Sequence, residues 1–156
     1  MDKSDNIIVK IKDLVFSPKL FSNYQTGTIL DELLCSYKGL PKGVNYMVIG
    51  DPGVGKTTII LDMLSNIQSN YPEAKILFVS AEMNEIDLAI YVQRYPKFQD
   101  LDILFLEMSF DEDNKCWDKF KQVLSQGWDV VAIDSFYELQ GIIKEEEEIT
   151  LKKAES

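Results

Sequence analysis

The most informative stretch of the sequence is Gly50-Asp51-Pro52-Gly53-Val54-Gly55-Lys56-Thr57. It fits the pattern G-x-x-x-x-G-K-[ST], in which a glycine-rich loop between a strand and a helix binds phosphate groups. Glycines allow backbone N–H groups to approach a phosphate without a Cβ atom in the way, and the helix expected after Gly55 adds the positive end of its dipole. A chance match is the alternative, and the apolar run before the loop and the helical pattern after it argue against chance.

The side chains of this loop have separate expected roles. Lys56 is expected to reach the β- and γ-phosphates of a nucleoside triphosphate, and the hydroxyl of Thr57 is expected to bind Mg²⁺. The full set of expected nucleotide-binding residues is Gly50, Asp51, Pro52, Gly53, Val54, Gly55, Lys56, Thr57 and Thr58.

The rest of the chain alternates apolar runs with helical patterns. Four short runs are continuously apolar, at residues 46–49, 76–79, 103–106 and 130–133. Between them, apolar residues recur at helical spacing in three stretches, at residues 59–67, 84–94 and 117–124. Asn84 is the expected N-cap of the second of these helices. Continuously apolar strands are typical of a parallel sheet that helices cover on both faces, so we predict a three-layer α/β sandwich with a mainly parallel sheet.

Two acidic residues follow apolar runs at positions that suit nucleotide chemistry. Asp134 directly follows the fourth run, which is the usual position of a carboxylate that helps to hold Mg²⁺ near a phosphate loop. Glu82 follows the second run and is expected at the carboxyl edge of the sheet, where ligands bind, as a general base for the attacking water. Glu82 could instead face solvent or start a helix. Glu85 is the nearby alternative for the general base, and Asp87 is expected to lie in the first turn of the next helix.

Composition excludes several other chemistries. The 156 residues include no histidine, which excludes Ser-His-Asp and Cys-His nucleophile systems and metal sites that use imidazole. Cys35 and Cys116 match no metal spacing, so we expect two thiols in a reducing compartment, although a disulfide stays open. No apolar run approaches the ~18 residues of a membrane span, and residues 1–12 lack the features of a secretory signal. We therefore expect a cytoplasmic protein with no membrane partner.

The net charge of −10 is unevenly distributed along the chain. Residues 1–56 carry seven lysines and six carboxylates, whereas the remaining residues carry nine basic and twenty acidic side chains. An acidic surface does not bind DNA by releasing counterions, so this charge argues against direct contact with DNA. The four consecutive glutamates at residues 145–148 are expected to be solvated or disordered.

Several segments resemble, in the same order, the opening of the RecA-like ATPases, a superfamily that includes the RadA, KaiC and replicative DnaB-type helicase groups. The segments that carry the resemblance are residues 26–27, 30–34, 39–43, 50–58, 78–83 and 132–135. The resemblance implies a P-loop ATPase that uses ATP and Mg²⁺. The residues it implies as catalytic are Lys56, Glu82 and Asp134, and those it implies at the metal are Thr57 and Asp134. It also implies a ring or filament of identical subunits that drives a DNA-associated process of the helicase, recombinase or repair type.

The chain departs from this family in two places. Residues 35–38 replace a glycine-rich turn. The family's core also adds a strand between the strand before the phosphate loop and the strand that ends at Asp134, whereas only 21 residues follow Ser135. The resemblance therefore implies an incomplete sheet, in the N-terminal part of a longer protein or in a truncated one. The expected organisation is an N-terminal strand or arm (1–25), a nucleotide-binding core (26–143) and an acidic tail or truncated continuation (144–156).

From the sequence, three functions stay open. The first is the ATPase motor, and the second is a non-catalytic module in which bound nucleotide organises an assembly. The third, a small P-loop kinase, is disfavoured because such kinases close several arginines over the phosphoryl group, and Arg94 is the only arginine here. Arg94 itself has two interpretations, contact with the γ-phosphate of a neighbouring subunit or pairing with local acidic residues.

Overall fold

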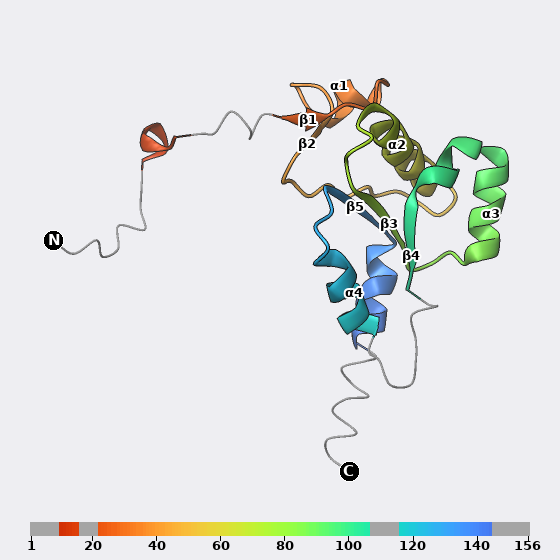
Figure 1. Cartoon of the computed structure of the whole chain (residues 1–156). Helices are drawn as coiled ribbons and strands as arrows, with labels where there is room; N and C mark the ends of the chain where they lie inside the picture. Colours follow the sequence, from red (N-terminus) through yellow and green to blue (C-terminus); the bar gives the residue numbers. More distant parts are fainter. Residues whose placement is uncertain (1–9, 16–21, 107–115, 145–156) are drawn as a thin grey trace, which may run out of the picture.

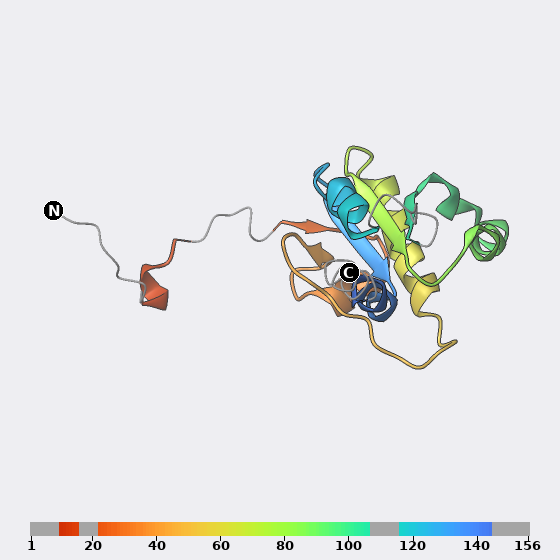
Figure 2. The same ribbon diagram turned by 90° about the horizontal axis from the view of Figure 1, so that it is seen from below.

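The computed structural model describes residues 10–15, 22–106 and 116–144 (Figure 1). The expected acidic tail or continuation (144–156) lies outside the described residues except for Lys144, as does most of the expected N-terminal arm (1–25). Residues 10–15 of the arm hold a short 3₁₀ helix, η1 (Ile11–Asp13), which is drawn apart from the body of the protein in Figures 1 and 2, whereas residues 22–25 belong to the body. The described residues of the candidate site all belong to the body.

A three-stranded parallel sheet forms the centre of the body. Its strands are β3 (Ile76–Ser80), β4 (Asp102–Phe105) and β5 (Val130–Asp134), in the spatial order β4-β3-β5. Ser80 at the end of β3 lies opposite Phe105 of β4 on one side and Asp134 of β5 on the other. All three strands consequently end at the same edge of the sheet, and they confirm three of the four predicted apolar strands.

Helices cover both faces of this sheet. The helices of one face are α2 (Lys56–Asn70) and α3 (Glu85–Arg94), and those of the other face are α4 (Cys116–Leu124) and a helix over residues 136–144 (Figures 1 and 2). Phe78 packs with the α2 side and Val79 with the α4 side, because successive strand residues point to opposite faces. The α/β arrangement with a parallel sheet is thus confirmed. None of the helices in the described ranges is long and apolar enough to cross a membrane.

Asn84 caps α3, as the sequence predicted. Its side-chain oxygen accepts hydrogen bonds from the backbone N–H groups of Ile86 (2.8 Å) and Asp87 (3.0 Å). The carboxylate of Asp87 in turn accepts the backbone N–H of Asn84 at 3.2 Å, which completes a capping box. Asp87 is therefore a helix-start residue rather than a candidate for catalysis.

A small N-terminal unit packs at the C-terminal end of α2. It consists of the antiparallel pair β1 (Asn23–Tyr24) and β2 (Leu40–Pro41) with the short helix α1 (Leu30–Leu34) between them. Gln25 joins this unit to α2, because its carbonyl accepts the Asn70 side-chain amide at 2.9 Å and its N–H donates to the Tyr71 hydroxyl at 3.2 Å.

Asp31 holds this N-terminal unit together. Its buried carboxylate accepts the N–H (2.8 Å) and hydroxyl (2.9 Å) of Thr26 and the N–H of Gly27 (2.8 Å). Burial by itself raises the pKa of Asp31, but the hydrogen bonds from Thr26, Gly27 and Thr28 outweigh it and hold the pKa below its ordinary value. The carboxylate is therefore charged in the folded protein at neutral pH.

The strand predicted at residues 46–49 does not form, and this prediction was wrong. The segment is extended but has no ladder partner, and the side chains of Met47 and Ile49 are 75% and 84% exposed. The hydroxyl of Tyr46 donates to the carbonyl of Leu34 at 2.7 Å, which holds the segment beside α1 rather than in the sheet. An apolar run becomes a parallel strand only when a neighbouring strand lies alongside it, and none of the described strands does so here.

We expect Asp31→Asn to lower the free energy of unfolding at pH 7 by about 1–3 kcal/mol, because the asparagine amide cannot accept all three hydrogen bonds. Denaturant unfolding of the two proteins measures the difference. Since the pKa of Asp31 is lower in the folded chain than in the unfolded chain, its stabilising effect is present above the unfolded-state pKa and is lost as pH falls through the folded-state pKa. The difference in the free energy of unfolding between wild type and Asp31→Asn should therefore become smaller below about pH 4.

Glu32→Gln is the matched control for this prediction. Glu32 is the next residue of α1, and its exposed side chain makes only a 3.9 Å ion pair with Lys38 among the described contacts. The free energy of unfolding should hardly change in this variant. An equal loss of stability in both variants would show that removing a charge from α1, and not losing the Asp31 hydrogen bonds, is responsible.

Candidate functional site

The phosphate loop leads directly into the first turn of α2. Gly53 and Gly55 adopt positive φ angles of 78° and 92°, a left-handed conformation that favours glycine. Gly55 is the N-cap of α2, and no side chain caps the first turn of this helix. The N–H groups of the first turn of α2 have no side-chain cap, so they could bind an anion.

Lys56 lies folded against the start of the same loop. Its ammonium group donates hydrogen bonds to the carbonyl oxygens of Gly50 at 2.8 Å and Asp51 at 3.0 Å. These bonds place the positive charge beside the loop backbone, within the set of residues predicted to bind nucleotide. Both carbonyls belong to exposed residues, so the ammonium group can exchange them for a phosphate without leaving a buried polar group unpaired.

Thr57 and Asp134 lie in direct contact, although 77 residues separate them. The Thr57 hydroxyl in the first turn of α2 donates to a carboxylate oxygen of Asp134 at the end of β5, at 2.5 Å. Asp134 is 8% exposed, so its carboxylate is shielded from solvent while one oxygen faces the loop. The structure therefore brings together the two residues that the sequence predicted at the metal.

The donor chemistry of this pair suits Mg²⁺. Hydroxyl and carboxylate oxygens are hard ligands, and Mg²⁺ binds proteins through one or two such groups while waters and substrate phosphates complete its shell. The described residues contain no cluster of three or more acidic, cysteine or histidine side chains that could hold a metal ion. Thr57 and Asp134 would thus hold the ion together with the phosphates of the nucleotide, and the residues present fit that role.

Glu82 lies close to this pair along the sheet, but its side chain does not reach it. The N–H of the preceding residue, Ala81, donates to the carbonyl of Asp134 at 2.8 Å, so the chain at Glu82 passes beside the end of β5. The Glu82 side chain is exposed, and in the described part of the chain it has no hydrogen bond or ion pair with Thr57 or Asp134. Its competitor Glu85 lies farther along the chain, in the exposed first turn of α3.

Arg94 and Cys35 lie outside this site. The guanidinium of Arg94, in the last turn of α3, lies 5.3 Å from the ring centroid of its neighbour Tyr95. Cys35 is a free thiol, and the side chain of Cys116 is not among those described. The site therefore contains lysine, threonine and carboxylate groups without a second cation from the described residues.

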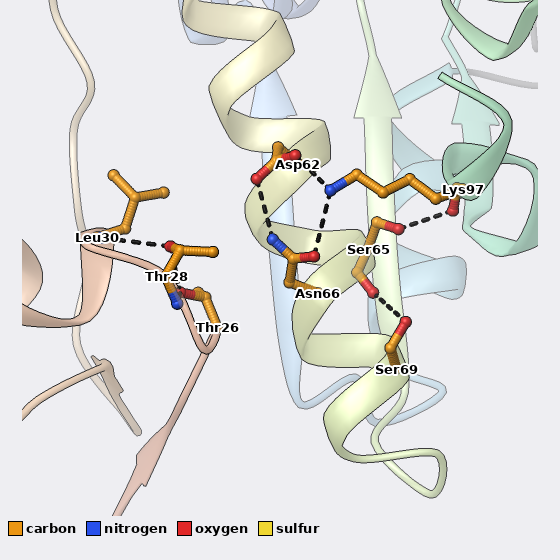
Figure 3. A network of polar contacts seen from close by, with 8 residues as sticks. All are labelled: Thr26, Thr28, Leu30, Asp62, Ser65, Asn66, Ser69 and Lys97. Atoms are coloured by element: carbon orange, nitrogen blue, oxygen red, sulfur yellow. Dashed lines mark hydrogen bonds and ion pairs between the residues drawn. The ribbon is translucent and has the colours of Figure 1, made fainter.

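A polar network between α2 and the segment after α3 was not predicted from the sequence. Lys97 donates to Asn66 at 3.2 Å and pairs with Asp62 at 2.5 Å, while the hydroxyl of Ser65 donates to the carbonyl of Lys97 at 2.7 Å (Figure 3). Ser69 continues the network by donating to the carbonyl of Ser65. The network ties the 3₁₀ helix η3 (Pro96–Asp100) to α2. Its only sequence signal is the four-residue spacing of the polar side chains on α2.

Comparisons of the chain with known protein families, with curated proteins and with solved structures found no match. The case for a function consequently depends on the motif, on the arrangement of the loop and the sheet, and on the chemistry of the residues that meet there.

We expect Thr57→Val to lower the free energy of unfolding by about 1–3 kcal/mol, because it removes a hydrogen-bond donor from a buried carboxylate. Valine keeps the β-branched shape of threonine, so the loss reports the hydroxyl. Denaturant unfolding at neutral pH measures it. Thr58→Val, the same change one residue later and away from Asp134, should leave the stability nearly unchanged, and an equal effect at both positions would argue against the Thr57–Asp134 bond.

Proposed function

We propose that this protein binds ATP with Mg²⁺ at the loop of residues 50–57 and hydrolyses it. The observation that carries the proposal is the contact between Thr57 and Asp134, because it places a hydroxyl and a carboxylate at the end of a phosphate-loop motif. The uncapped start of α2 and the ammonium group of Lys56 add donors for the phosphates. No histidine is needed for this chemistry, which agrees with the composition.

In ATP hydrolysis, the residues of this chain would have the following roles. The backbone N–H groups of the loop hold the phosphates, and Lys56 neutralises charge that develops on the oxygen between the β- and γ-phosphates. Thr57 and Asp134 would hold Mg²⁺, and the bound ion would polarise the γ-phosphate. Glu82 accepts a proton from the attacking water as the new oxygen–phosphorus bond forms and the bond to the leaving ADP breaks. The products are ADP and inorganic phosphate.

The resemblance to RecA-like ATPases extends this proposal to an oligomer, a ring or a filament, that drives a DNA-associated process. Support for the extension comes from the order of the motifs, with the loop first, Glu82 after β3 and Asp134 after β5. The net charge of −10 opposes direct DNA binding by this chain. Stimulation of ATP hydrolysis by DNA would support the motor function, and equal rates with and without DNA would argue against it.

A non-catalytic nucleotide-binding module is the second candidate. The observation in its favour is the exposed Glu82 side chain, which has no described contact with Thr57 or Asp134. Such a module would bind ATP at the same loop and would use the bound nucleotide to organise an assembly. Tight Mg²⁺-dependent ATP binding without measurable turnover would favour this candidate. The P-loop kinase is disfavoured, because the single arginine, Arg94, lies outside the site.

Lys56→Ala should weaken the binding of ATP in the presence of Mg²⁺ by about tenfold or more, because a charge-assisted hydrogen bond to phosphate is lost. Isothermal titration calorimetry on both proteins measures the affinities. Lys12→Ala is the control, since Lys12 is exposed and makes none of the described contacts with the loop. Equal ATP affinity in wild type and in Lys56→Ala would refute the assignment of the nucleotide site.

Glu82→Gln should keep the ATP affinity and lower the turnover rate about 10²- to 10⁴-fold, because glutamine cannot accept the proton of the attacking water. A phosphate-release assay beside calorimetry separates the two quantities. Glu85→Gln is the matched comparison, because it makes the same change three residues later. A loss of turnover in Glu85→Gln, with normal turnover in Glu82→Gln, would transfer the role of the base to Glu85.

A further inference from the structure

Ser80, the last residue of β3, is a polar residue in an otherwise apolar and buried strand, and it is only 1% exposed. A buried hydroxyl needs hydrogen-bond partners, and both described partners of this hydroxyl belong to one residue. The hydroxyl donates to the carbonyl of Met83 at 2.8 Å and accepts the N–H of Met83 at 3.1 Å. It therefore closes a turn over residues 80–83, at the start of the connection from β3 to α3 (Figure 1).

Glu82, the proposed general base, lies between two fixed points of this turn. On one side, the N–H of Ala81 donates to the carbonyl of Asp134 at 2.8 Å. On the other side, the backbone of Met83 is bonded to the Ser80 hydroxyl, and the Met83 side chain packs against the core on the α2 side. Within this described turn, Glu82 is the only exposed residue. The turn therefore fixes the backbone of Glu82 and leaves its side chain outside the core.

The turn begins beside the residues proposed to hold Mg²⁺. Ser80 and Asp134 are direct neighbours in the parallel pairing of β3 with β5, and neighbouring strands lie about 4.7–4.9 Å apart. Phe78 and Ala132, two residues earlier in these strands, pack on the α2 side. Because strand residues two positions apart point to the same face, Ser80 and Asp134 also face α2, from which Thr57 contacts Asp134. The Ser80 hydroxyl thus fixes the turn at the same end of the sheet as the proposed metal residues.

We propose that Ser80 is a positioning residue for ATP hydrolysis, because its hydroxyl holds the turn that carries the general base Glu82. This inference rests on the proposed hydrolysis and on Glu82 as its base. A base must lie within hydrogen-bond reach of the water that it deprotonates, and a displacement of about 1 Å can lower a rate about 10²-fold. The donor of the Ser80 hydroxyl is already used on Met83, so Ser80 acts through the turn and not on the nucleotide itself.

Ser80→Ala should lower the turnover rate about 10- to 10²-fold and leave the Mg²⁺-dependent affinity for ATP unchanged, because the turn loses its tie to β3 while the phosphate loop keeps its contacts. A phosphate-release assay and calorimetry on the full chain measure the two quantities. A fall of the ATP affinity together with turnover would mean that the whole site is disturbed and would overturn the positioning role.

Ser65→Ala is the matched control for this variant. Ser65 is also buried, at 3%, and its hydroxyl also donates to a backbone carbonyl, that of Lys97, at 2.7 Å. It lies about two helical turns beyond Thr57 in α2. Ser65→Ala should therefore lower the stability of the fold and keep the turnover rate of wild type. An equal fall of turnover in both variants would overturn the inference.

A cycle with Glu82→Gln separates positioning from a general loss of structure. If Ser80 acts through Glu82, Ser80→Ala should have no further effect on the residual turnover of Glu82→Gln. A further fall in the double variant, or wild-type turnover in Ser80→Ala beside impaired turnover in Glu82→Gln, overturns the inference and leaves the proposed base standing. Normal turnover in Glu82→Gln overturns the proposed base, and ATP binding without turnover in wild type overturns the proposed hydrolysis. Either result overturns the inference as well.

Ser80→Cys takes the place of the alanine variant if thermal unfolding shows that Ser80→Ala does not fold. Cysteine is close to serine in size, but its thiol is a weak donor and a weak acceptor, so it ties Met83 less firmly to β3. Turnover should again fall while the affinity for ATP is unchanged. Wild-type turnover in a folded Ser80→Cys protein would overturn the inference.

Discussion

The hydrogen bond between the Thr57 hydroxyl and the Asp134 carboxylate holds the phosphate loop against the sheet. The segment before the loop has no ladder partner among the described strands, and its described anchor is the hydrogen bond from Tyr46 to Leu34, which does not join it to the sheet. Its anchors are the packing of α2 on the sheet and the contact of Thr57 with the end of β5. The same two oxygen-bearing side chains are those that Mg²⁺ would use, so one contact serves both the fold and the proposed chemistry.

The sheet and the site illustrate what the sequence can predict. The apolar runs that became β3, β4 and β5 could be recognised because each is continuously apolar and is bounded by turn or helix signals, although only β3 is buried along its whole length. The meeting of Thr57 with Asp134 could also be predicted, because parallel strands end at one edge and the loop motif fixes where α2 begins. The N-cap role of Asn84 followed from local hydrogen-bonding chemistry alone.

Other features depend on partners that a sequence pattern does not identify. The run at residues 46–49 indicates a preference for burial, but whether it enters the sheet depends on which strand lies beside it. Asp31 gives no sign in its helix that its carboxylate will bind the backbone of the preceding turn. The contacts of Lys97 with α2 likewise join residues more than thirty positions apart. In each case the sequence does not show which distant residue will lie beside the side chain in the folded protein.

The central claim is that Thr57 and Asp134 act together to bind Mg²⁺ with the nucleotide. A double-mutant cycle tests it most directly, with calorimetry of ATP binding, in the presence and absence of Mg²⁺, on wild type, Thr57→Val, Asp134→Asn and the double variant. If the two side chains share the ion, each single variant should lose most of the affinity that Mg²⁺ adds and the double variant should lose little more, with a coupling of about 0.5–3 kcal/mol. Additive losses, or a Mg²⁺ effect that survives in all variants, would contradict it.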